Sequence, residues 1–128
     1  MFSLQENPID IESFKNRPNP NNGALVSFEG IVRADQHPEG LVSGLLYVAD
    51  ADICIPEGEK ILHEASARFS ITDAVCVQRI GQINVGETAV WIGVWAGHRD
   101  EACKACRYII EEIKGRLVVW KKEFFNGK

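Results

Sequence analysis

The spacing of apolar residues predicts two amphipathic helices. Over residues 57–69 the apolar positions recur every three or four residues, and Pro56 suits the first turn of a helix that begins there. Residues 100–114 show the same period. The ends of this helix are also marked, because Asp100 can cap the start and Gly115 stands at the usual C′ position. The apolar face of this second helix consists of Ala102, Cys106, Ile109, Ile110 and Ile113.

Segments rich in β-branched and aromatic residues predict strands. These are residues 24–33, 41–48, 74–83, 88–96 and 117–124. Residues 88–96 are apolar on both faces, which places this strand in the middle of a sheet. Residues 1–22 show no clear period and are predicted to be irregular. The order of elements predicts one α+β domain over residues 1–128, with two main helices and a mostly antiparallel sheet.

Composition narrows the class of protein. The chain has 128 residues, 45% hydrophobic and 25% charged, with a net charge of −4. That charge disfavours a nucleic-acid binder, which would usually present a basic face. No apolar run approaches the ~20 residues that cross a bilayer, and the N-terminus does not have the pattern of a signal peptide. We therefore expect a cytoplasmic protein that acts on neither nucleic acid nor membranes.

Cationic residues gather at three joints between the predicted elements. His98 and Arg99 precede the second helix, Lys114 ends it, and Lys121 and Lys122 lie in the last strand. The helix dipole disfavours a cation at a helix start, so a His-Arg pair there suggests a bound anion. Simpler explanations remain open, since a histidine is often structural and a lysine in the last helical turn complements the dipole.

The four cysteines do not form a recognisable metal or redox motif. Cys103 and Cys106 form a CxxC pair inside the predicted helix, whereas redox pairs normally sit at a helix N-terminus after a strand. A zinc site completed by Cys54 and Cys76 is an alternative, but their spacing does not indicate one. We expect reduced thiols that serve as small packing residues, no metal and no cofactor.

Seven short segments together resemble one known family. They cover residues 23–125 in order, and the ordered set is more specific than any one segment. The segments are Gly23–Arg33, Gln78–Gly81, Val85–Glu87, Ala96–Arg99, Ala105–Arg107, Ile113–Lys114 and Trp120–Glu123. In these features the chain resembles the large, catalytic subunit of molybdopterin synthase.

The resemblance implies a fold, an activity and partners. The fold would contain a β-hammerhead. The activity would be sulfur transfer to cyclic pyranopterin monophosphate, which forms the dithiolene of molybdopterin in molybdenum cofactor biosynthesis. The sulfur would arrive as a thiocarboxylate on the C-terminal glycine of a small ubiquitin-like subunit. The assembly would be a heterotetramer, in which a homodimer of large subunits carries one small subunit at each end.

The resemblance also assigns roles to individual residues. Arg33, His98 and Arg99 fall on substrate-anchoring positions, and an arginine suits phosphate because its planar fork donates two hydrogen bonds. Lys114 matches the lysine that meets the incoming glycine, where a cation stabilises developing negative charge. Lys121 matches a second active-site lysine. If the two ammonium groups are close, each lowers the pKa of the other, so one can carry a proton.

The expected helix also constrains how these residues cooperate. If residues 100–114 are one helix, Arg99 and Lys114 lie about 22 Å apart along its axis. We therefore expect His98 and Arg99 to complete the pocket of a neighbouring protomer across a two-fold axis. Ile110 lies one turn before Lys114 and is predicted, with Phe28, to form an apolar wall. Lys122 points away from Lys121 on the strand, so it is either a further substrate ligand or plain surface.

The chain departs from the family pattern in two places. Val48 stands where a glutamate is common, so the pocket wall or partner contact there can differ. The chain ends at Lys128, before a tail that often adds aromatic and basic residues. Two other functions remain as alternatives. One is an idle homologue that binds a ubiquitin-like partner or a pterin without turnover, and the other is an unrelated phosphate-ester hydrolase, for which no residue set is evident.

Overall fold

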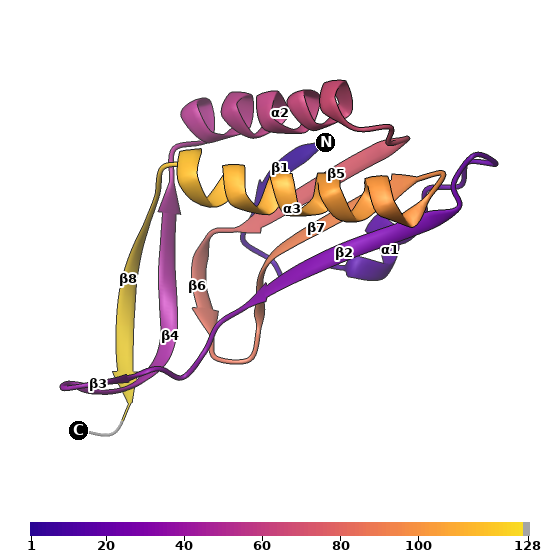
Figure 1. The fold of residues 1–128 in the computed structure, drawn as a ribbon. Coiled ribbons are helices and arrows are strands. Elements are labelled where there is room, and N and C mark those ends of the chain that lie inside the picture. The colour runs from indigo at the N-terminus through magenta and orange to yellow at the C-terminus, as the bar shows by residue number, and fades with distance from the viewer. Residues whose placement is uncertain (127–128) are drawn as a thin grey trace.

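A computed structural model describes residues 1–126 and shows two β-sheets, with the two long helices on one face of the first sheet (Figure 1). The first sheet has the order β1-β5-β7-β2. Its strands are β1 (Phe2–Gln5), β5 (Asp73–Arg79), β7 (Thr88–Ala96) and β2 (Ala24–Ile31). β1 pairs parallel to β5 and the other neighbours are antiparallel. β7 occupies an inner position, as its two apolar faces predicted.

The second sheet is built around β4 (Gly40–Ala49). β8 (Val119–Asn126) pairs with β4 over its length, while β3 (Gln36–His37) and β6 (Gly81–Asn84) pair with parts of it. In Figure 1 these strands run across the direction of the first sheet, beyond the end of α3. This crossed arrangement is consistent with the β-hammerhead that the resemblance implies, and an α+β fold is confirmed.

Two long helices cover one face of the first sheet (Figure 1). They are α2 (Ala51–Arg68) and α3 (Arg99–Arg116). The main core lies between them and the sheet, because the apolar faces of both helices are buried against β5 and β7. The opposite face of the sheet is covered by α1 (Ile11–Lys15), where Phe14 packs on Trp91 and Trp95 of β7.

Several predicted boundaries were wrong. Residues 1–22 are not irregular throughout, because β1 and α1 form there, each too short for a periodic pattern. The segment 74–83 is two strands, β5 and β6. Gly81, the first residue of β6, has a φ of 85°, a left-handed conformation that favours glycine and lets the chain pass from the first sheet to the second. The chain end Gly127–Lys128, where a short tail was noted, lies outside the described residues.

Both long helices begin earlier than predicted. α2 starts after Asp50, whose carboxylate accepts a hydrogen bond from the backbone N–H of Asp52 at 3.0 Å, so Pro56 lies inside the helix. α3 is capped by His98 without a side-chain hydrogen bond, and Asp100 instead pairs with Lys104 at 3.1 Å. Gly115 is a helical residue and not a C′ glycine, since α3 ends at Arg116.

An ion-pair cluster joins the end of α3 to α2. The Arg116 guanidinium lies 2.6 Å from both Glu57 and Glu64 of α2 and 3.0 Å from Glu112 of its own helix. Tyr108 also donates to Glu64, at 2.7 Å. One guanidinium shared by three carboxylates is geometrically specific, so the cluster fixes the last turn of α3 against its neighbour.

We predict opposite effects of alanine at the two helical glycines Gly58 and Gly115. A Cβ at Gly58 would overlap the buried ring of Phe2, so Gly58→Ala should destabilise the protein by about 1–3 kcal/mol despite its better helix propensity. At Gly115 a Cβ meets nothing within 4 Å, so Gly115→Ala should stabilise it by up to about 1 kcal/mol. Urea denaturation of both variants checks this, and a destabilising Gly115→Ala would contradict the helical assignment.

We also predict that Glu64 makes stability sensitive to acid. Hydrogen bonds from Arg116 and Tyr108 lower the pKa of Glu64 from 4.5 to about 2. The carboxylate therefore stabilises the fold above its unfolded pKa, and this contribution is lost as the pH falls toward 2. Thermal unfolding of the wild type and of Glu64→Gln should differ above pH 5 and converge near pH 2. A difference that does not change with pH would contradict the prediction.

Candidate functional site

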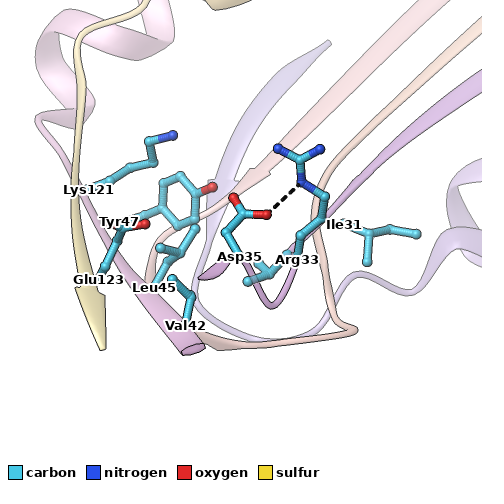
Figure 2. A pocket seen from close by; sticks show the side chains of 9 residues that line it. Ile31, Arg33, Asp35, Val42, Leu45, Tyr47, Lys121 and Glu123 are labelled. Carbon is cyan, nitrogen blue, oxygen red and sulfur yellow. Dashed lines mark ion pairs between the residues drawn. The ribbon is translucent and has the colours of Figure 1, made fainter. Parts of the chain in front are cut away.

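Two adjoining cavities lie where α3 ends between the two sheets. The larger has a volume of about 520 Å³ and the smaller about 420 Å³. Ile31, Arg33, Tyr47 and Lys121 line both, so the two cavities form one continuous site. Figure 2 shows the smaller cavity, with side chains from β4 and β8 on one side and from the segment after β2 on the other. The larger cavity adds Lys114 at the end of α3.

Three predicted cations converge on this site from three different elements. Lys114 comes from the last turn of α3, Lys121 from β8, and Arg33 from the segment that follows β2. Within residues 1–126, neither lysine forms an ion pair, whereas Arg33 lies 3.3 Å from Asp35 (Figure 2). The two lysine ammonium groups have no counter-charge within 4 Å among these residues, so they favour an anionic ligand although Asp35 and Glu123 add negative charge to the smaller cavity.

The strand pairing explains why Lys121 faces the cavity and Lys122 does not. Side chains alternate along β8, so Val119, Lys121 and Glu123 share the face that lines the cavities. Lys122 lies on the other face, with its ammonium 6.0 Å from the centre of the Phe124 ring. The structure therefore does not bring Lys122 to this site.

The predicted apolar wall lies beside the cations. Phe28 from β2 and Ile110 from α3 both line the larger cavity, together with Ile113 and Leu117 near the end of the helix. Ile110 and Lys114 are one turn apart on the same helical face, as their spacing predicted. Apolar walls reduce the local dielectric, which strengthens the attraction of the neighbouring cations for an anion.

His98 and Arg99 lie at the opposite end of α3. They line a separate cavity of about 540 Å³ with Gly23, Gly97 and other residues around the helix start. α3 is one continuous helix of 18 residues, so the expected separation of about 22 Å between Arg99 and Lys114 holds. Within one chain, these two residues do not reach Arg33, Lys114 and Lys121.

The site also contains a tyrosine, two carboxylates and a glutamine to which the sequence analysis assigned no role. Tyr47 lies between the two cavities, and Asp35 and Glu123 add negative charge to the smaller one. Gln78 lines the larger cavity from β5, and its buried amide donates to the carbonyls of Arg79 at 2.9 Å and Ala89 at 3.2 Å. Gln78 directly follows the apolar run of residues 74–77 in β5, and a polar side chain at the end of such a run was the signal that could have identified it.

Three of the four cysteines are buried. Burial raises the pKa of Cys76 to about 12 and that of Cys106 to about 11, so both remain protonated thiols. Cys54 donates its S–H to the carbonyl of Val118 at 3.2 Å, and Cys103 is exposed on α3. None of the four lines the two cavities.

Neither a metal cluster nor a membrane-spanning helix is found in the described part of the chain. Across residues 1–126, no group of three or more His, Cys, Asp or Glu side chains is arranged to hold a metal ion. None of the helices there is long and apolar enough to cross a bilayer.

Comparisons with known proteins identify the family of this chain. The model of the MoaE protein family matches residues 4–116. The molybdopterin synthase catalytic subunit of Pyrococcus abyssi is 43% identical over 80% of this chain and 69% of its own length. That of Thermoplasma volcanium is 38% identical over 94% of this chain and 86% of its own. The chain spans 53% of the longer relative from Oryza sativa, which is 36% identical over the matched part.

Solved structures show the same fold. The crystal structure of molybdopterin synthase from Staphylococcus aureus superposes with a TM-score of 0.91 and 30% identity, over 98% of this chain and 91% of that one. A complex of subunits 1 and 2 of the molybdopterin-converting factor from Helicobacter pylori gives a TM-score of 0.80 at 19% identity, over 99% of this chain and 86% of that one. Since the family model and the relatives cover most of the sequence, this chain belongs to the MoaE family, that of the molybdopterin synthase catalytic subunits.

Proposed function

We propose that the two adjoining cavities transfer sulfur from a thiocarboxylated protein tail to cyclic pyranopterin monophosphate. Sulfur transfer in molybdenum cofactor biosynthesis is the activity of the family to which the chain belongs. The observation that carries the proposal is the convergence of Arg33, Lys114 and Lys121 on one space beside an apolar wall. A phosphate and a thiocarboxylate are both anions, and both would be attracted by the lysines and by Arg33, whose guanidinium has further donors besides the one beside Asp35.

The geometry supports a division of roles among the cations. Arg33 is exposed beside the shared part of the cavities and would hold the phosphate through its guanidinium. Lys114 would bind the thiocarboxylate at the end of α3. The thiocarboxylate sulfur would bond to a pterin carbon, which loses an oxygen substituent. Water would then attack the terminal acyl carbon, so that the C–S bond breaks and the tail ends as a carboxylate, while the ammonium stabilises the negative charge on the acyl oxygen. Lys121, across the cavity on β8, would donate a proton to the oxygen that leaves the pterin.

The sulfur source in this proposal is the partner and not the chain. Cys76 and Cys106 are buried, protonated thiols that lie outside the cavities, so they are poor sulfur carriers. A tail delivered by a small ubiquitin-like subunit needs only an open cavity with a cation inside it. In the Helicobacter pylori structure, subunits 1 and 2 of the molybdopterin-converting factor form a complex. A heterotetramer in the cytoplasm is part of the proposal.

The position of His98 and Arg99 supports a site shared between two protomers. These two residues share a cavity at the far end of α3, where Lys114 of the same chain cannot reach. In a two-fold dimer, the same surface of both subunits meets, so each helix start can approach the partner's lysines. His98 and Arg99 would then add two donors to the pterin phosphate.

An idle homologue that binds a partner without turnover is the competing function. Such a protein would have no need to keep Arg33, Lys114 and Lys121 around one cavity, and the structure brings all three there. Turnover distinguishes the two functions. Wild-type protein mixed with a thiocarboxylated small subunit and the cyclic pterin should form the dithiolene, and binding without product would support the idle homologue.

We predict that the two cavity lysines are required for turnover and that their neighbour Lys122 is not. Lys114→Ala and Lys121→Ala should each lower the single-turnover rate by about 10²–10³-fold, as the loss of one charge-stabilising donor does. Lys122→Ala is the matched control, since it removes the same charge from the opposite face of β8, and its rate should stay within about threefold. Equal losses in Lys121→Ala and Lys122→Ala would refute the assignment of the cavity face.

We also predict that two inactive variants restore activity when they are mixed. In a shared site, Arg99→Ala and Lys114→Ala damage different ends of α3, so a mixed dimer has one intact site and one doubly damaged site. Random exchange of equal amounts makes half of the dimers mixed, so activity should recover to about one quarter of wild type. Subunits unfolded and refolded together provide the sample. No recovery in dimers shown to be mixed would contradict the shared site.

A further inference from the structure

We propose that the hydroxyl of Tyr47 donates a hydrogen bond to the phosphorylated pterin, which makes Tyr47 a further substrate-contacting residue of this site. The inference rests on the proposed function. Its first support is position, because Tyr47 is one of four residues that line both cavities. In Figure 2 its hydroxyl points from β4 toward the side of the cavity that carries Asp35 and Arg33.

The strand register holds Tyr47 beside the catalytic lysine. Tyr47 is paired with Lys121 in the β4–β8 ladder, so the two side chains project to the same face of the sheet. On its other side, Tyr47 is paired with Gly81 of β6, which has no side chain to cover the ring. The phenol therefore lines the cavities beside the Lys121 side chain, and its cross-strand neighbour in β6 has no side chain to cover it.

The ring is fixed while the hydroxyl is free. The ring packs against the small core of Val32, Ile83 and Ala89, where the two sheets meet. Within residues 1–126, the Tyr47 hydroxyl forms no hydrogen bond, and it is not among the buried polar atoms that are without a partner, so it opens onto the cavity while the ring is half-buried. A donor that is held in place and unpaired is suited to a ligand, because little conformational entropy is lost when the ligand binds.

Tyr47 adds a neutral donor to a group of charged ones. Burial raises the pKa of Tyr47 above 10, so the hydroxyl keeps its proton at physiological pH. The charged groups around the smaller cavity are Arg33, Asp35, Lys121 and Glu123. Arg33 and Lys121 attract any anion, whereas a neutral hydroxyl contacts one polar atom in one direction. It therefore orients the pterin between the arginine and the lysine.

Tyr47→Phe tests the proposal, because it removes the hydroxyl and keeps the ring in its core. The Kd and KM for the cyclic pterin should rise by about tenfold, the value of one hydrogen bond of about 1.4 kcal/mol. The KM for the thiocarboxylated subunit should not change. Tyr108→Phe is the matched control, since it loses a hydrogen bond to Glu64 between α2 and α3, away from the cavities. It should lower the melting temperature and leave both KM values unaltered.

The outcomes separate this inference from the proposed function. A wild-type protein that forms no dithiolene would refute the function, and calorimetry of pterin binding to both proteins still tests Tyr47. A normal wild type with a Tyr47→Phe variant within twofold in pterin affinity would overturn the role of Tyr47 alone. A rise confined to the KM for the small subunit would also overturn it, because the hydroxyl would then contact the tail.

Discussion

The site depends on the burial of the apolar face of α3 against the first sheet. Ala102, Ala105 and Ile109 are fully buried there, so the helix cannot rotate or slide without exposing core side chains. A fixed helix has two fixed ends, and both carry cations. Arg116 secures the last turn to α2 through Glu57 and Glu64, which holds Lys114 at the mouth of the cavities. The rigidity of α3 thus positions a charge that contributes nothing to the core.

The second constraint is the change of direction at Gly81. The positive φ of this residue lets one chain segment serve both sheets, first as β5 and then as β6. Because β6 pairs with β4, the second sheet is anchored next to the end of α3. The cavities are the space left where the two sheets and the helix meet. Their walls therefore come from segments far apart in sequence, including Arg33, Lys114 and Lys121.

Electrostatics and burial divide the polar groups of this protein into two kinds. The charges of Arg116, Glu57 and Glu64 are paired at short distances and stabilise the packing of the helices. The charges of Lys114 and Lys121 are unpaired within the described residues, and both side chains line the larger cavity. Unpaired like charges lower stability, which is typical of functional sites. The proposed substrates, both anionic, would relieve that repulsion when they bind.

Local patterns in the sequence predicted the two long helices and most of the longer strands, and the motifs predicted residues that line the candidate site. The period of Ala102, Cys106 and Ile109 predicted α3, and Lys114 and Ile110 were correctly placed on one face. The starts of both helices were missed, because a cap depends on hydrogen bonds such as that from Asp52 to Asp50, which composition does not reveal. β1 was missed because four residues become a strand only when β5 lies beside them.

The sequence by itself determined which residues carry charge, which faces are apolar and which family the motifs resemble. Only the tertiary structure decided which of these residues meet. Lys121 and Lys122 are adjacent and have the same side chain, but the pleat of β8 directs Lys121 into the cavities and Lys122 away from them. Tyr47 had no motif at all, and the register of β4 with β8 placed it beside Lys121. The physical reason is that convergence arises from packing between distant segments, whereas sequence patterns record only neighbours along the chain.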